Sequence, residues 1–197
     1  DLRILAGFGI TEEAVKEHKL GLEDFRITFP IKSKTGYWVN MRRYLPPQRR
    51  IEGSKEPKCL NIRNLGQRRY YPYEAFDQNE IIIVEGEKDC IAARAQGYNA
   101  VTSTGGSAIP TEEVSLFKGK DVVLMLDTDT VGQKIVNTYM VLLKNIANSI
   151  RVIRLPKKDF VAYYEACQDA NELVNIWQFA TTYEELERQK EAIEAQE

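Results

Sequence analysis

Acidic side chains follow two apolar segments of the sequence, and their types and spacing suit the binding of a metal ion. Glu85 directly follows the apolar run Ile81–Val84. Asp127 and Asp129 follow the run Val122–Leu126. Such runs are typical of strands buried on both faces, and carboxylates just past their ends lie where open α/β sheets bind ligands. Converging carboxylates repel one another unless a cation neutralises them, and hard oxygen ligands suit Mg²⁺ or Mn²⁺.

The elements that would position these acids alternate between strand and helix from residue 79 to about 156. This order predicts an α/β fold with a parallel sheet, right-handed crossovers and flanking helices. Gly132, three residues after the second Asp, would let the backbone turn closely at the start of a helix. The expected strands are 81–84, 100–103, 122–126 and 150–155, and the expected helices are 87–96, 111–117 and 131–147.

The segments on either side differ from this central part. Residues 1–78 predict a smaller α+β subdomain with a short helix over Glu12–Lys19 and a hairpin formed by residues 25–31 and 36–44. Residues 159–197 predict a helical tail or linker, in which Thr182 and Glu185 are spaced as a capping box. We therefore expect three parts, with the catalytic domain at residues 79–158.

Charge is distributed unevenly along the chain, although the formal net charge is only −2. The segment from Arg26 to Arg69 contains twelve Lys or Arg residues against two acids. Asymmetry of this kind is typical of a surface that binds a polyanion, with aromatic residues available to stack on bases. A solvated basic face with the aromatics in the core explains the composition equally well. The interleaved aromatic residues are Tyr37, Trp38, Tyr44, Tyr70 and Tyr71.

Bulk properties exclude several other classes of protein. No apolar run approaches the length of about 18 residues that a membrane span needs, and the first residues do not resemble a signal peptide. Cys59, Cys90 and Cys167 are few and widely spaced, so neither a disulfide framework nor a zinc site is expected. A reducing, cytoplasmic compartment fits this cysteine usage best.

The acidic motifs resemble those of the Toprim domain, which DnaG-type primases, topoisomerases and certain nucleases share. That domain has a strand ending in Glu-Gly and a later strand ending in Asp-x-Asp, here Glu85-Gly86 and Asp127-Thr128-Asp129. Asp89 is similar to a further acid of the primases, and the segments 84–89 and 155–159 are similar to bifunctional phage primase-helicases. The resemblance implies metal binding by Glu85, Asp127, Asp129, Asp89 and Asp159, with Glu85 as a ligand or a proton acceptor.

The preceding segment resembles the basic subdomain that comes before Toprim in primases. The similar motifs are Ile27–Ile31, Gly36, Arg43–Leu45, Pro57–Asn61, Gly66 and Tyr70. The resemblance implies that Arg43, Lys58 and Asn61 lie near template or nucleotide, with Arg68 and Arg69 as looser candidates. It implies a DNA primase core that synthesises RNA primers on single-stranded DNA from nucleoside triphosphates, beside a fused or separate replicative helicase. It also favours a phage or other mobile element as the origin.

Other functions remain compatible with the same residues. A Toprim nuclease would use the same acids to direct water at a phosphodiester, and a non-catalytic module would bind single strands without turnover. A topoisomerase is disfavoured, because 197 residues are too few for its strand-passage domains.

Overall fold

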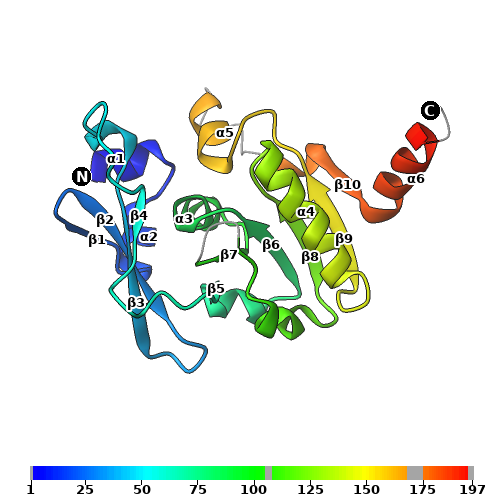
Figure 1. The fold of residues 1–197 in the computed structure, drawn as a ribbon, viewed down its shortest axis with the longest axis horizontal. Helices are drawn as coiled ribbons and strands as arrows, with labels where there is room; N and C mark the ends of the chain where they lie inside the picture. Colours follow the sequence, from blue (N-terminus) through cyan, green and yellow to red (C-terminus); the bar gives the residue numbers. More distant parts are fainter. Residues whose placement is uncertain (1, 105–107, 168–174, 195–197) are drawn as a thin grey trace.

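Two β-sheets organise the computed structural model, which describes residues 2–104, 108–167 and 175–194. The four-stranded sheet lies at the left in Figure 1, the six-stranded sheet lies beside it, and helix α3 (Glu87–Ala95) runs between them. Within the described residues, no helix is long and apolar enough to cross a membrane.

The N-terminal sheet is antiparallel, with strands in the order β1-β2-β3-β4. The predicted hairpin is confirmed, because β2 pairs with β3 in a register that sets Phe29 opposite Arg42. Two short helices precede it, α1 (Leu2–Gly7) and α2 (Glu12–Glu17). The strands are β1 (Gly21–Glu23), β2 (Arg26–Lys32), β3 (Trp38–Tyr44) and β4 (Cys59–Leu60), and a 3₁₀ turn, η1 (Pro47–Arg49), separates the last two.

The larger sheet has the strand order β10-β9-β8-β6-β7-β5. Its four central strands are parallel, which confirms the expected βαβ pattern. The antiparallel edge strands β5 and β10 were not predicted, because two or three residues are too few to show a period. Both edge strands lie outside residues 79–158. The strands are β5 (Tyr70–Tyr71), β6 (Glu80–Val84), β7 (Ala100–Ser103), β8 (Asp121–Met125), β9 (Ser149–Ile153) and β10 (Ala180–Thr182).

Alternate residues of the central strands pack into two different cores, as expected for strands buried on both faces. On β6, Ile82 and Val84 join a core with residues of α3, of α5 (Phe160–Ala166) and of the N-terminal sheet. Ile81 and Ile83 join a second core with residues of α4 (Thr130–Leu143). The sheet is therefore held rigidly from both sides, which fixes the position of its strand ends.

The C-terminal part is more integrated than a solvated linker. The capping box is confirmed: Thr182 Oγ1 accepts from Glu185 N at 3.3 Å, and Glu185 Oε2 accepts from Thr182 N at 2.9 Å. Helix α6 (Tyr183–Glu194) begins there, and its Leu186 is buried in the second core. The remaining 3₁₀ segments are η2 (Tyr73–Asp77), η3 (Thr111–Phe117, predicted as an α-helix) and η4 (Ile176–Phe179).

Candidate active site

The three acids singled out first lie at one edge of the larger sheet. β6 and β8 are parallel neighbours with Val84 opposite Met125, so Glu85 and Asp127 leave the sheet at the same edge. Asp129 caps α4, and its Oδ1 accepts from Val131 N at 3.1 Å and from Gly132 N at 3.0 Å.

Gly132 lies so close to the backbone of Asp127 that no side chain fits at this position. A Cβ atom at this position would lie 1.9 Å from the carbonyl oxygen of Asp127. The absence of a side chain therefore lets the helix start directly against the strand-end loop and brings Asp129 back toward Asp127.

Burial and mutual repulsion destabilise the ionised form of two of these acids. Burial, then the charges of Glu85 and Asp159, raise the pKa of Asp127 to about 6, although Lys158 opposes the shift. Burial and the charge of Asp129 raise the pKa of Glu85, whose Oε2 is buried without a hydrogen-bond partner. The pKa of Asp129 itself is lowered, chiefly by the hydrogen bond from Gly132 N. A cation at this edge would relieve the repulsion.

Lys158 places a positive charge between the carboxylates of Asp127 and Asp129. Its Nζ lies 3.6 Å from Asp127 Oδ2 and 3.3 Å from Asp129 Oδ2, and its side chain is 60% exposed. In the described parts of the chain, no three Asp, Glu, His or Cys side chains are arranged to hold a metal ion as they stand. Two observations nevertheless suit a divalent ion. The ammonium of Lys158 shows that a cation is held between the two aspartates, and Glu85 Oε2 has no hydrogen-bond partner. Lys158 would have to move aside, which its exposure permits.

Asp89 and Asp159 form a second acidic pair, linked by a different lysine. Lys88 Nζ lies 3.4 Å from a carboxylate oxygen of each. Burial, partly offset by Lys88, raises the pKa of Asp89 to about 7. For Lys88, burial lowers the pKa, but the two carboxylates outweigh this and leave it raised.

A cavity of about 450 Å³ joins Glu85, Asp127, Asp89 and Asp159 to the N-terminal sheet, whereas Asp129 is not part of its lining. Three of the predicted basic or polar residues line it, namely Lys58, Asn61 and Arg68. The structure does not bring the other two to this cavity. Arg43 pairs with Glu23 at 3.4 Å on the opposite face of the sheet, and Arg69 donates to Gln67 at 3.0 Å.

Arg42 lines the same cavity but was not singled out from the sequence. Its Nε donates to Glu87 Oε1 at 2.8 Å and its Nη1 donates to Asn61 Oδ1 at 3.0 Å. Both side chains of the Arg42–Glu87 ion pair are at least 90% buried. The pair ties the N-terminal sheet to α3 immediately beside Glu85. Strand alternation in the predicted hairpin was the signal available, because Arg42 shares a face with Phe29 whereas Arg43 does not.

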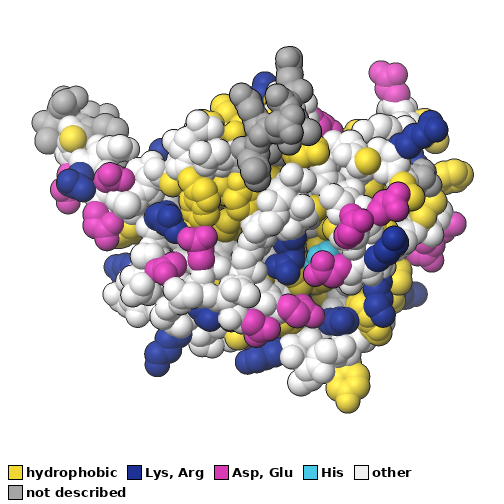
Figure 2. All heavy atoms as spheres, turned by 180° about the vertical axis from the view of Figure 1, so that it is seen from behind, with side chains coloured by type: hydrophobic (Ala, Val, Ile, Leu, Met, Phe, Trp, Pro, Cys, Tyr) yellow, Lys and Arg dark blue, Asp and Glu magenta, His cyan; other side chains and the backbone are white. Residues whose placement is uncertain are grey.

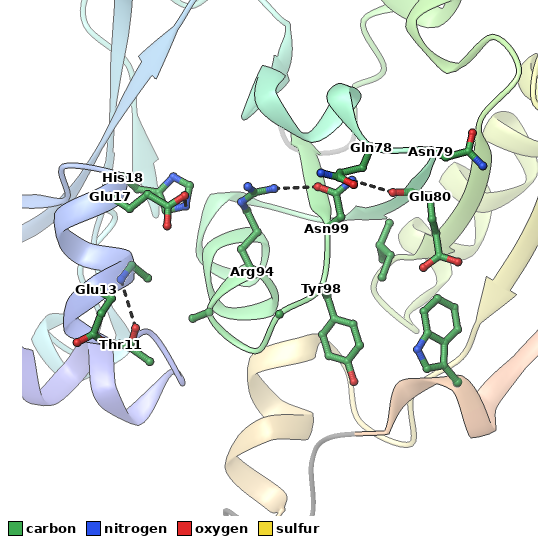
Figure 3. Close-up of a pocket in the computed structure, with 15 residues that line it drawn as sticks. Thr11, Glu13, Glu17, His18, Gln78, Asn79, Glu80, Arg94, Tyr98 and Asn99 are labelled. Carbon is green, nitrogen blue, oxygen red and sulfur yellow. Dashed lines mark hydrogen bonds and ion pairs between the residues drawn. The ribbon is translucent and has the colours of Figure 1, made fainter.

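A larger cavity of about 780 Å³ lies elsewhere, at the amino ends of the strands (Figure 3). Some of its polar groups bond to one another: Arg94 donates to Asn99, whose side-chain nitrogen donates to the carbonyl oxygen of Glu80. Figure 2, the view from behind, shows acidic and basic side chains interspersed rather than gathered by sign. Parallel sheets bind ligands at the carboxyl ends of their strands, so the smaller cavity is the better candidate site.

Several known proteins resemble this chain in sequence or in fold. Residues 79–154 match the Toprim domain family. Over 120 residues, 55% of this chain, the sequence is 35% identical to a DNA primase of Pseudomonas putida. It is 35% identical over 78 residues to a DNA primase of Clostridium acetobutylicum. The chain spans only 17% and 13% of the lengths of these two relatives.

Solved primase structures share the fold over most of the chain. A DNA primase domain from Pseudomonas aeruginosa matches with a TM-score of 0.68 and 24% identity, covering 98% of this chain and 63% of that one. The primase fragment of the bacteriophage T7 primase-helicase matches with a TM-score of 0.58 and 18% identity, covering 81% and 67%. Residues 79–154 are therefore similar to Toprim domains, and the chain as a whole shares the fold of solved DNA primase domains.

Proposed function

We propose that this chain is the catalytic core of a DNA primase, which synthesises short RNA primers on single-stranded DNA by metal-dependent nucleotidyl transfer. The observation that carries the proposal is the shared cavity, which Glu85 and Asp127 of the larger sheet line together with Lys58, Asn61 and Arg68 of the N-terminal part. A nucleic-acid end and a triphosphate both need cationic and hydrogen-bonding groups opposite a carboxylate cluster. The similarity to DNA primases supports the same assignment.

Glu85, Asp127 and Asp129 are the proposed ligands of Mg²⁺ or Mn²⁺. A bound ion would neutralise the triphosphate and stabilise the charge that develops when a 3′-hydroxyl attacks the α-phosphate and pyrophosphate leaves. Glu85, with its raised pKa and unpartnered oxygen, is also suited to accept the proton of that hydroxyl.

The basic residues are proposed to hold the polyanionic substrates. Lys58 lies with its Nζ 5.8 Å from the centroid of the Tyr44 ring and lines the cavity beside Asn61. Arg68 is exposed at the same cavity and is suited to a phosphate. Arg43 and Arg69 point elsewhere, so we assign them to the path of the template outside the cavity.

A replicative helicase, fused or separate, is the proposed partner. One of the matched structures comes from a primase-helicase of a bacteriophage, which also favours a phage or mobile-element origin.

Incorporation of labelled ribonucleotides on single-stranded DNA tests the function. We expect short RNA products from the wild-type chain with Mg²⁺ or Mn²⁺, and a loss of about a thousandfold in Asp129→Asn. The Asn side chain retains an oxygen that can cap α4, so the fold is preserved while the charge is removed. Metal-dependent loss of labelled single strands without nucleotides would indicate a nuclease instead. Metal-independent DNA binding without products, unchanged in Asp129→Asn, would indicate a binding module.

A further inference from the structure

A buried lysine pairs with two of the acids near the edge of the larger sheet. Lys88 extends from the first turn of α3, and its Nζ lies 3.4 Å from Asp89 Oδ1 and 3.4 Å from Asp159 Oδ2. The side chain is only 12% exposed. Its Nζ lies 5.5 Å from the centroid of the Phe8 ring, so the N-terminal segment covers it. The ammonium is thereby fixed between carboxylates from two different elements.

The two carboxylates also accept hydrogen bonds from the first turn of α5. Asp89 Oδ1 accepts from Val161 N at 3.0 Å, and Asp159 Oδ1 accepts from Ala162 N at 2.7 Å. Three of the four carboxylate oxygens of Asp89 and Asp159 therefore have Lys88 or a backbone N–H as a partner. A metal ion that bound here would have to displace Lys88 or break these bonds.

The other lysine of the cluster is held quite differently. Lys158 bridges Asp127 and Asp129, but its side chain is 60% exposed, against 12% for Lys88. An exposed lysine can turn into water at little cost, so a divalent ion can replace Lys158. A buried ammonium that lost its carboxylates would remain desolvated and unpaired, so Lys88 resists replacement.

We propose that Lys88 is the permanent cation of the Asp89–Asp159 side of the cluster, and that divalent ions bind only on the side of Glu85, Asp127 and Asp129. Lys88 is then a positioning residue that holds α3 against α5. The proposal departs from the sequence-based expectation that Asp89 and Asp159 are metal ligands. It rests on the proposed function, because it concerns the metal ions which that function needs.

Calorimetric titration with Mn²⁺, without template or nucleotide, tests this division. We compare the wild-type chain with Lys88→Met, which keeps the apolar stem but removes the charge. The variant is expected to bind one more Mn²⁺ per chain, because two freed carboxylates then lack a cation. The additional ion should disappear in the double variant Lys88→Met/Asp159→Asn. Lys158→Met, the matched control, should keep the wild-type stoichiometry and bind Mn²⁺ more tightly.

Asp159→Asn in the otherwise wild-type chain keeps the proposal falsifiable even if Lys88→Met does not fold. Asn can still cap α5, and we expect the Mn²⁺ stoichiometry to be unchanged and the Kd to remain within about twofold of wild type. Loss of an ion, or binding tenfold weaker, would make Asp159 a metal ligand and overturn the proposal. Unchanged stoichiometry in folded Lys88→Met would also overturn it.

The same titrations separate this proposal from the proposed function. A wild-type chain that bound no Mn²⁺ would overturn both. Loss of Mn²⁺ in Asp159→Asn from a chain that synthesises primers would overturn only the role of Lys88. The expected pattern of stoichiometries in a chain that makes no primers would support the role of Lys88 and count against primase activity.

Discussion

The two sheets present their site residues in different ways. In the six-stranded sheet, Glu85 and Asp127 follow the ends of buried strands, so their position depends only on where an apolar run stops. In the N-terminal sheet, Arg42 and Tyr44 project from within a strand toward the cavity, while Arg43 projects to the other face. If a predicted strand boundary is wrong by one residue, acids at the strand end are still recognised. If the predicted alternation along a strand is wrong by one residue, the inward-facing and outward-facing residues are exchanged.

Replacing each of two adjacent arginines tests this contrast most strongly. Arg42→Met should lower the free energy of unfolding by about 3–5 kcal/mol, because it leaves the buried Glu87 carboxylate without its partner. Arg43→Met removes a half-exposed pair with Glu23 and should cost less than about 1 kcal/mol. Urea unfolding of both variants measures the difference. Equal losses would show that the two arginines do not differ in environment as described.

The strand-end loop can be tested through its glycine. Gly132→Ala should destabilise the fold by about 1–3 kcal/mol, because the added methyl overlaps the Asp127 carbonyl oxygen. Gly7→Ala is the matched control, since the new Cβ on α1 would meet no side chain and no other described segment within 4 Å, and alanine is the better helix former. Thermal unfolding should show a lower Tm for the first variant only. A Gly132→Ala protein as stable as wild type would contradict the close approach.

The raised pKa of Asp127 predicts a pH dependence in the metal-free protein. Folding raises this pKa from its ordinary value of about 3.9 to about 6, so the folded state binds more protons than the unfolded state in that window. Stability should therefore fall as pH rises from about 4 to 6. Asp127→Asn should reduce the slope, leaving the contributions of Glu85 and Asp89, which have the same sign. Urea unfolding midpoints, measured over this pH range with a chelator present, give the slope of stability against pH. An identical slope in the variant would show that Asp127 does not contribute to the pH dependence.

The smallest expected effect concerns one phosphate contact. Lys58→Ala should weaken template binding and reduce the slope of log K against log salt by about 1. Lys144→Ala is the control, because Lys144 is exposed at the far end of α4. Fluorescence anisotropy with a labelled single strand over a series of salt concentrations measures both slopes. If the two variants behave alike, Lys58 is not a phosphate contact.

Sequence reasoning succeeded where local chemistry determines the structure. The four parallel strands, the hairpin and the Thr182–Glu185 capping box were all predicted, because apolar runs, turn residues and caps are local signals. The acids Glu85, Asp127 and Asp129 were placed at one edge by the same logic.

The edge strands and the roles of Arg42 and Lys88 were missed because they depend on contacts between distant segments. The edge strands β5 and β10 form only because longer strands offer them a partner. Arg42 acquires its role from Glu87, 45 residues away, and Lys88 from Asp159, 71 residues away. No pattern within a window of sequence contains those pairings.

A crystal structure with Mn²⁺ and a ribonucleoside triphosphate would test the central claim most directly. We predict anomalous density for Mn²⁺ at about 2.1 Å from carboxylate oxygens of Asp127 and Asp129, with the triphosphate extending toward Lys58 and Asn61. Lys88 should remain between Asp89 and Asp159. Manganese bound instead at Asp89 and Asp159, or a triphosphate outside this cavity, would contradict the account.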